Sequence, residues 1–138
     1  MKPEQLAHLH GLAFEGQGRG WSKDEFARLL QAPEVFLVGN ARGIALVRAV
    51  ADEAEILTLA CVPDHRRKGI GLALVANLEN TAKARGVGRI FLEVSSENAA
   101  GIRLYDKSGY SEVGRRTGYY TLVDGTKADA IVMEKRLV

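Results

Sequence analysis

The stretch Glu55-Ile-Leu-Thr-Leu-Ala-Cys-Val-Pro-Asp-His-Arg-Arg-Lys-Gly-Ile-Gly71 decides how the chain is organised. Its first half is an apolar strand, which ends at Pro63 because proline cannot donate to a sheet ladder. Its second half is a basic turn punctuated by glycine, and an apolar segment with helical periodicity follows at once. Such a turn presents free backbone N–H groups and the positive end of a helix dipole to an anion. We therefore expect a phosphate or pyrophosphate to bind here.

The composition is that of an ordinary soluble globular protein, with 46% hydrophobic and 26% charged residues among 138. This length fits one domain, residues 1–138, around a single core. A formal net charge of +2 is too small to indicate nucleic-acid binding, and no apolar run is long enough for a membrane span. One cysteine, no signal-peptide pattern and three scattered histidines predict a cytoplasmic protein without a metal site.

The hydrophobic periodicity predicts a mixed sheet with helices, and hence the α/β class. The order is two helices, an antiparallel start, one strand–helix–strand crossover, then a helix and a closing hairpin. A capping box at Ser22-Lys-Asp-Glu25 opens the second helix. The other predicted elements are a helix over 3–14, strands over 35–39 and 43–50, the strand and helix on either side of the glycine turn, a strand over 90–95, a helix over 98–108, and extended segments over 110–122 and 129–137.

Glu93 is a carboxylate in the middle of an otherwise apolar strand. Period-two alternation puts it on the face opposite Leu92 and Val94. An exposed glutamate at a sheet edge is the simplest interpretation of such a residue taken alone. The crossover places this strand centrally and beside the phosphate loop, however, which favours a role in chemistry.

Asn98 and Tyr105 share one face of the next predicted helix, because they are seven residues apart. As a helix N-cap, Asn98 is fully explained by a structural role. Tyr105 could likewise be a core aromatic residue whose hydroxyl is satisfied. The sequence alone leaves both interpretations open.

The glycine turn also matches a family pattern. Arg66-x-x-Gly69-x-Gly71 resembles the acetyl-CoA pyrophosphate loop of the GNAT N-acetyltransferases, whose pattern is Arg/Gln-x-x-Gly-x-Gly/Ala. The resemblance covers nearly the whole chain and implies the GNAT fold, a mixed central β-sheet with a splayed strand pair flanked by helices. Three further stretches resemble the RimI branch of ribosomal-protein N-terminal alanine acetyltransferases: Leu92-Glu-Val-Ser-Ser-Glu-Asn98, Leu104-Tyr-Asp-Lys-Ser-Gly-Tyr110 and Gly114-Arg-Arg-Thr-Gly-Tyr-Tyr120.

The resemblance implies a role for each candidate site residue. Glu93 would be the general base, and Tyr105 the acid that protonates the departing thiolate. The main chain at Leu59 and Cys61 would bind acetyl-CoA, and Asn98 would contact its pantetheine arm. The loop residues assigned to acetyl-CoA are Arg66, Arg67, Lys68, Gly69, Ile70 and Gly71, and the residues assigned to the acceptor are Trp21, Tyr119 and Tyr120.

The predicted function is transfer of the acetyl group of acetyl-CoA directly to the α-amino group of a protein N-terminus. By resemblance, the acceptor is the N-terminal alanine of a small-subunit ribosomal protein, and neither a membrane nor nucleic acid is expected as a partner. Thr121 and Ala128 depart from the branch pattern in the region that resembles its peptide-binding hairpin. Two alternatives stay open: acetylation of lysine, a polyamine or another small amine, and a non-catalytic acyl-CoA-binding module, which would need neither Glu93 nor Tyr105.

Overall fold

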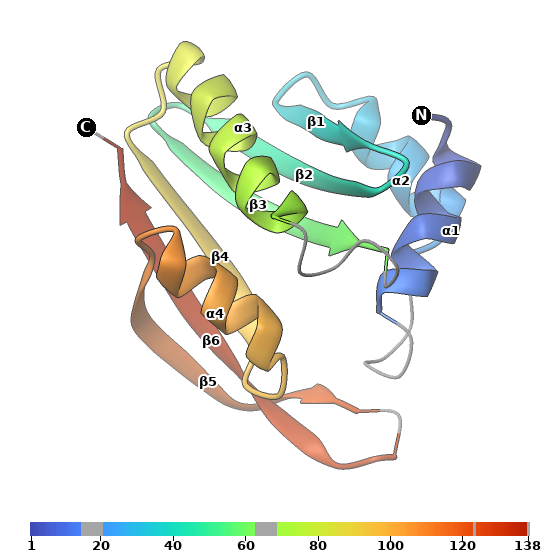
Figure 1. The fold of residues 1–138 in the computed structure, drawn as a ribbon, viewed down its shortest axis with the longest axis vertical. Coiled ribbons are helices and arrows are strands. Elements are labelled where there is room, and N and C mark those ends of the chain that lie inside the picture. The colour runs from blue at the N-terminus through green and yellow to red at the C-terminus, as the bar shows by residue number, and fades with distance from the viewer. Residues whose placement is uncertain (15–20, 63–68, 123, 138) are drawn as a thin grey trace.

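The computed structural model describes residues 1–14, 21–62, 69–122 and 124–137 (Figure 1). None of the helices in these ranges is both long and apolar enough to cross a membrane. The helices are α1 (Pro3–Ala13), α2 (Lys23–Leu30), α3 (Ile70–Ala84) and α4 (Ala99–Lys107), and the strands are β1 (Val35–Asn40), β2 (Gly43–Val50), β3 (Glu53–Cys61), β4 (Arg89–Ser95), β5 (Ser111–Thr121) and β6 (Lys127–Arg136).

The strands form one mixed sheet in the order β1-β2-β3-β4-β6-β5. The pair β3 and β4 is parallel and is joined through α3, whereas the other neighbouring strands run antiparallel. A crossover helix is the usual way to connect parallel neighbours. The predicted α/β class and mixed sheet are confirmed, and β4 is central as expected.

The helices cover both faces of the sheet. On one face, α3 and α4 pack over the main core cluster, in which Leu78 of α3 and Ile90 of β4 are fully buried. On the other face, α1 and α2 bury Leu6 and Phe26 against Ile44 of β2. Figure 1 shows α3 and α4 in front of the strands, with α1 and α2 gathered near β1. The site forms in the middle of the sheet, between β3 and β4, in the part that the two helix layers leave open.

The ends of the elements differ from the sequence prediction by one or two residues. The helix predicted over 98–108 runs over Ala99–Lys107, because Asn98 has non-helical dihedral angles and is the N-cap, while Ser108 is the C-cap. The last strand starts at Lys127, two residues earlier than predicted. That extra length pairs with the end of β5, which periodicity alone does not reveal.

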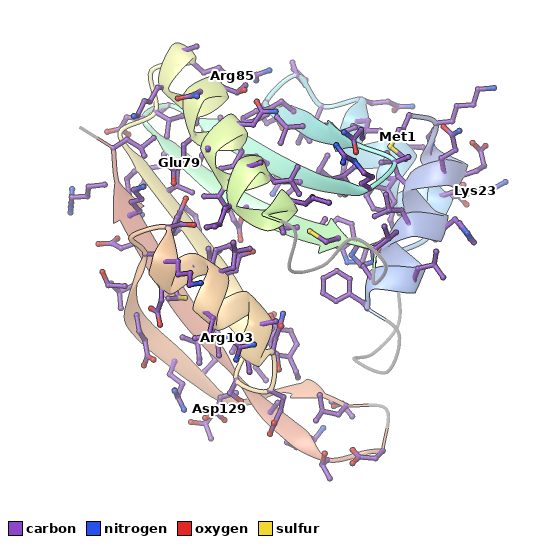
Figure 2. The ribbon with its side chains drawn as sticks, viewed as in Figure 1. Met1, Lys23, Glu79, Arg85, Arg103 and Asp129 are labelled. Atoms are coloured by element: carbon purple, nitrogen blue, oxygen red, sulfur yellow. The ribbon has the colours of Figure 1, made fainter. Side chains whose placement is uncertain are left out.

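A partly buried ion pair ties α3 to β6. Lys135 Nζ lies 3.0 and 3.2 Å from the two carboxylate oxygens of Glu79, and it also donates to the carbonyl oxygen of Ser108 at 2.7 Å. The Tyr110 hydroxyl donates to Glu79 Oε2 at 3.1 Å. The side chains of Glu79 and Lys135 are 11% and 29% exposed. The network joins α3, which is labelled at Glu79 in Figure 2, to the turn after α4 and to β6.

Glu79→Leu is expected to lower the free energy of unfolding by about 2 kcal/mol, because it removes the carboxylate partner of the partly buried Lys135 ammonium. Urea unfolding would measure the loss. The double variant Glu79→Leu/Lys135→Met replaces the pair by apolar side chains and is expected to recover most of the stability. A double variant as unstable as the single one would show that the ion pair itself, rather than the stranded charge, matters.

Candidate active site

The candidate site is a cleft at the place where β3 and β4 part. The parallel ladder joins only Glu53–Ile56 to Arg89–Leu92, and beyond it the two strands spread apart (Figure 1). This is the splayed strand pair that the resemblance implies. A cleft of about 460 Å³ opens there. The predicted site residues that line it are Trp21, Leu59, Glu93, Asn98, Tyr105, Tyr119 and Tyr120.

The backbone N–H and C=O groups of Leu59 and Cys61 on β3 point toward this opening. The Val62 N–H donates to the Arg42 carbonyl oxygen at 3.0 Å, on the side of β2. Because backbone groups alternate in direction along a strand, those of Leu59 and Cys61 point to the other side, where β4 has moved away. Leu59 lines the cleft, while the Cys61 side chain packs against the main core cluster.

Glu93 lies on β4 with its side chain on the face opposite the buried Leu92 and Val94, as the alternation predicts. The Glu93 side chain is 23% exposed, and its Oε1 lies 3.4 Å from Nη2 of Arg116 on β5. Arg116 reaches it across β6, where the register places the small Ala130 between Arg116 and Ser95. Glu93 is therefore a partly hydrated carboxylate that can accept a proton inside the cleft.

Glu55 is a second carboxylate in the cleft, although the sequence pattern marks it only as the start of a strand. It pairs in register with Phe91, so it lies on the same sheet face as Glu93. Burial raises the pKa of Glu55; Arg48 opposes the rise, Glu93 adds to it and Arg116 opposes it. The signal that could have found Glu55 is the crossover itself, because it makes β3 and β4 parallel neighbours.

Tyr105 reaches the cleft from α4. Its side chain is 7% exposed, and its ring meets the edge of the Tyr110 ring at a centroid distance of 5.8 Å. Burial raises the pKa of the Tyr105 hydroxyl, and the nearby thiol of Cys61 raises it further. The hydroxyl therefore stays protonated at neutral pH and is able to donate a proton.

Asn98 serves as the N-cap of α4 and also lines the cleft. Its Oδ1 accepts a hydrogen bond from the Gly101 N–H at 3.0 Å. The capping role that the sequence leaves open is therefore present. A cap that uses the side-chain oxygen leaves the amide –NH₂ as a donor for a ligand.

An aromatic cluster forms one end of the cleft. The His10 ring stacks on Phe14 and Trp21, at centroid distances of 4.5 and 5.2 Å. The Trp21 N–H donates to His10 Nδ1 at 3.2 Å, so Nε2 carries the proton that points to Thr58 Oγ1, 3.0 Å away on β3. The sequence gives no sign of His10 and Thr58, because a contact across 48 residues leaves no local pattern. The cluster fixes Trp21 against the sheet.

The opposite end of the cleft carries the tyrosine pair of β5. Tyr119 and Tyr120 meet edge to face at a centroid distance of 5.2 Å. The Arg116 guanidinium lies over the Tyr119 ring, 5.1 Å from its centroid. The tyrosines are thus linked to Glu93 through the same arginine. The structure brings the predicted base and the predicted acceptor residues into one assembly.

The predicted phosphate loop is described only in part. Arg66, Arg67 and Lys68 lie outside the described residues, whereas Gly69 is the N-cap of α3 and Ile70 its first residue. The first intrahelical hydrogen bond runs from the Ala73 N–H to the Gly69 carbonyl oxygen at 3.0 Å. The amide groups that precede it have no acceptor within the helix and can bind an anion.

Gly71 has a packing role that the sequence did not indicate. A Cβ at this position would lie 3.1 and 3.2 Å from the two methyl groups of Leu104 on α4. Its missing side chain therefore lets the start of α3 approach α4 closely. A larger residue at this position would require the Leu104 methyl groups to shift by a few tenths of an ångström.

Gly71→Asp is expected to weaken acetyl-CoA binding by at least about tenfold, since it places a negative charge in the first turn of α3, where the phosphates are expected, and crowds Leu104. Isothermal titration with CoA would measure the effect. Gly71→Ala is the matched control, because it adds the crowding without the charge. Equal losses in the two variants, or no loss in either, would contradict a phosphate site at the start of α3.

Among the described residues, no group of three or more histidine, cysteine, aspartate or glutamate side chains is placed to hold a metal ion. Glu93, Glu55 and Tyr105 can take part in proton transfer within the cleft, beside main-chain donors and aromatic side chains. This set suits acyl transfer to an amine, in which a proton must leave the nucleophile and another must reach the leaving group.

The sheet, the splayed strands and the cleft define an N-acetyltransferase fold, and comparison with known proteins agrees. The acetyltransferase (GNAT) family matches residues 4–110. The chain belongs to this family and is an acetyl-CoA-dependent N-acetyltransferase.

Its relatives include enzymes that modify one ribosomal protein. The ribosomal protein bS18-alanine N-acetyltransferase of Escherichia coli K12 is 35% identical over 130 residues, which are 94% of this chain and 84% of the relative. A putative enzyme of the same name from Bacillus subtilis 168 is 30% identical over 139 residues, covering 96% and 90% of the two chains. The crystal structure of the Escherichia coli ribosomal-protein-S18-alanine N-acetyltransferase superposes with a TM-score of 0.85 at 32% identity, over 97% of this chain and 86% of that one.

Proposed function

We propose that this acetyltransferase acts on the α-amino group of a protein N-terminus, and that its acceptor is the N-terminal alanine of ribosomal protein bS18. The observation that carries the chemistry is that Glu93 and Tyr105 line one cleft, at the point where β3 and β4 part. The acceptor is inferred from relatives with that named activity, which match 94% and 96% of the chain. The single cysteine favours a cytoplasmic location.

In this proposal Glu93 takes a proton from the acceptor amine, either directly or through a water molecule. A terminal amine has a pKa of about 8 and a lysine side chain about 10.4, so deprotonating lysine at neutral pH costs about 3 kcal/mol more. A carboxylate base is therefore better matched to an N-terminal amine than to a lysine side chain. The freed amine attacks the thioester carbonyl carbon; a C–N bond forms, the C–S bond breaks, and the nitrogen releases its second proton to water as the amide forms.

Tyr105 supplies the proton that the leaving thiolate takes up. Its hydroxyl is protonated at neutral pH because burial raises its pKa. It lies in the same cleft as Glu93 but on the helix layer rather than on the strand. One group thus accepts a proton on the acceptor side while another donates a proton on the donor side, and no covalent enzyme intermediate is needed.

Acetyl-CoA would be held by the main chain of Leu59 and Cys61, by the amide groups at the start of α3 and by Asn98. The acceptor would enter between the two aromatic ends of the cleft, against Trp21 on one side and the tyrosines of β5 on the other. The proposal is supported by the placement of Leu59, Asn98, Trp21 and the two tyrosines, which all line the cleft.

A thiol-release assay with three acceptors tests the proposal. The acceptors are a peptide with the bS18 amino terminus beginning with alanine, the same peptide with a blocked terminus and an internal lysine, and a polyamine. Release of CoA thiol only with the free-terminus peptide is expected. The blocked peptide is the matched control, because it differs only in the amine that is offered.

Two other outcomes would overturn the acceptor or the activity. Release only with the polyamine would favour a small-amine acceptor, for which the presence of two carboxylates in the cleft, Glu55 and Glu93, is the supporting observation. No release with any acceptor, together with tight acetyl-CoA binding, would contradict transfer to a terminal amine, to lysine and to a polyamine alike.

A further inference from the structure

β5 carries a bulge opposite a single residue of β6. The register pairs Arg116 with Ala130 and Tyr120 with Ala128, so three residues of β5 face Asp129 alone. β5 therefore has two more residues than β6 over this span. Bulges are common next to active sites, where they redirect side chains. This bulge lies directly before the tyrosine pair that lines the cleft.

The carboxylate of Asp129 holds this bulge. Its Oδ1 accepts a hydrogen bond from the Gly118 N–H at 2.9 Å, and Gly118 has a φ of +63°, a conformation that favours glycine. Its Oδ2 accepts from Nη1 of Arg115 at 3.2 Å. One side chain thus bonds both the main chain and a side chain of β5.

Asp129 is itself fixed on its other side. Its N–H donates to Ser96 Oγ at 3.0 Å, and its carbonyl oxygen accepts from the Ser96 N–H at 2.9 Å. Ser96 directly follows β4, the strand that carries Glu93. Figure 2 labels Asp129 below α4, where β6 and β5 lie side by side. Asp129 therefore connects the end of β4 to the bulge in β5.

The bulge determines where the tyrosines lie. Without its two extra residues on β5, Tyr120 would shift about 7 Å along the sheet and would no longer face Ala128. Because the number of extra residues is even, Tyr120 keeps the sheet face of Arg116 and remains in the cleft. Tyr119, beside it, rests under the Arg116 guanidinium that also contacts Glu93.

We infer that Asp129 is a positioning residue for the acceptor: by accepting the Gly118 N–H and pairing with Arg115, it sets the bulge that places Tyr119 and Tyr120. Asp129 does not line the cleft, so it acts through these neighbours rather than by contact with a substrate. Only the identity of the acceptor in this inference rests on the proposed function. The acetyl-CoA side of the cleft lies on β3, the start of α3 and Asn98. Among the described residues, the Asp129 side chain bonds only to β5, and the bonds from Asp129 to Ser96 use main-chain groups that Asp129→Ala retains, so the acetyl-CoA side is expected to be unaffected.

Asp129→Ala is expected to raise the KM for the acceptor peptide about tenfold, as for a lost hydrogen bond to a charged group, while the KM for acetyl-CoA and the kcat at saturating acceptor stay within about twofold. Amide hydrogen exchange over residues 117–121 is expected to become about tenfold faster, because the Gly118 N–H loses its acceptor. Asp129→Asn retains an oxygen that can accept from the Gly118 N–H. In this variant the acceptor KM and the exchange rate are expected to stay close to those of the wild type.

Asp124→Ala is the matched control. Asp124 lies in the same hairpin but does not line the cleft, and its Oδ1 accepts from the Thr126 N–H at 3.0 Å and from the Thr126 hydroxyl at 2.6 Å. It is expected to change neither the acceptor KM nor exchange over 117–121. Faster exchange in Asp129→Ala with an unchanged acceptor KM, or no change in either, would overturn the inference. If a different acceptor from the panel is the substrate, the proposed function fails, and the same KM comparison with that acceptor still decides the role of Asp129.

Discussion

Replacement of Glu93 by glutamine is expected to lower kcat by roughly 10²–10⁴-fold, the usual contribution of a general base, with acetyl-CoA affinity nearly unchanged. The side chain lies in the cleft, partly exposed, with its Oε1 3.4 Å from Nη2 of Arg116. Glutamine keeps the size of the side chain but has no basic oxygen that could take a proton from the acceptor amine. Steady-state kinetics with the acceptor peptide, together with titration of CoA, would measure both quantities.

Two further carboxylates make this test specific. Glu97→Gln changes an exposed glutamate just beyond β4 and is expected to leave kcat unchanged. Glu55→Gln changes the other carboxylate in the cleft and is expected to lower kcat less than Glu93→Gln does. Glu55 lies within the paired part of β3 and β4, whereas Glu93 lies beyond the last pair, where the strands part. If kcat falls strongly in Glu55→Gln and stays near the wild-type value in Glu93→Gln, then Glu55 is the base and Glu93 is not.

Much of the fold could be predicted because its signals are local. The capping box at the start of α2 is present as predicted: Ser22 Oγ accepts from the Glu25 N–H, and the Glu25 carboxylate accepts from the Ser22 N–H, both at 3.2 Å. Alternation along β4 correctly separated Glu93 from the buried face. The glycine turn, followed by an apolar helix, correctly indicated the crossover that makes β3 and β4 parallel.

The parts of the site that were missed depend on contacts between distant segments. The bond from His10 to Thr58 joins α1 to β3, and the parallel register alone brings Glu55 beside Phe91. The bulge opposite Asp129 likewise exists only in the pairing of β5 with β6. Periodicity describes which face of its own element a residue occupies. It does not describe which residue of another element lies opposite, and the cleft is built from such pairs.

Tyr105→Phe is the second large effect we expect, with kcat lower by roughly 10²–10⁴-fold and acetyl-CoA affinity nearly unchanged. Phenylalanine preserves the buried ring on α4 and removes only the proton that the leaving thiolate needs. Because burial raises the pKa of the hydroxyl above its ordinary value of about 10, Tyr105 remains protonated at every pH below that value. The wild-type pH–rate profile should therefore show no alkaline decline caused by Tyr105 below pH about 10.

Tyr110→Phe is the matched control for this prediction. Tyr110 is also a buried tyrosine whose pKa is raised, chiefly by burial and then by Glu79, and its ring contacts that of Tyr105. It does not line the cleft, and its hydroxyl donates to Glu79. Its loss is expected to reduce stability and leave kcat near that of the wild type. Equal kcat losses in the two variants would mean that both tyrosines act through packing, because of these two residues Tyr105 alone lines the cleft.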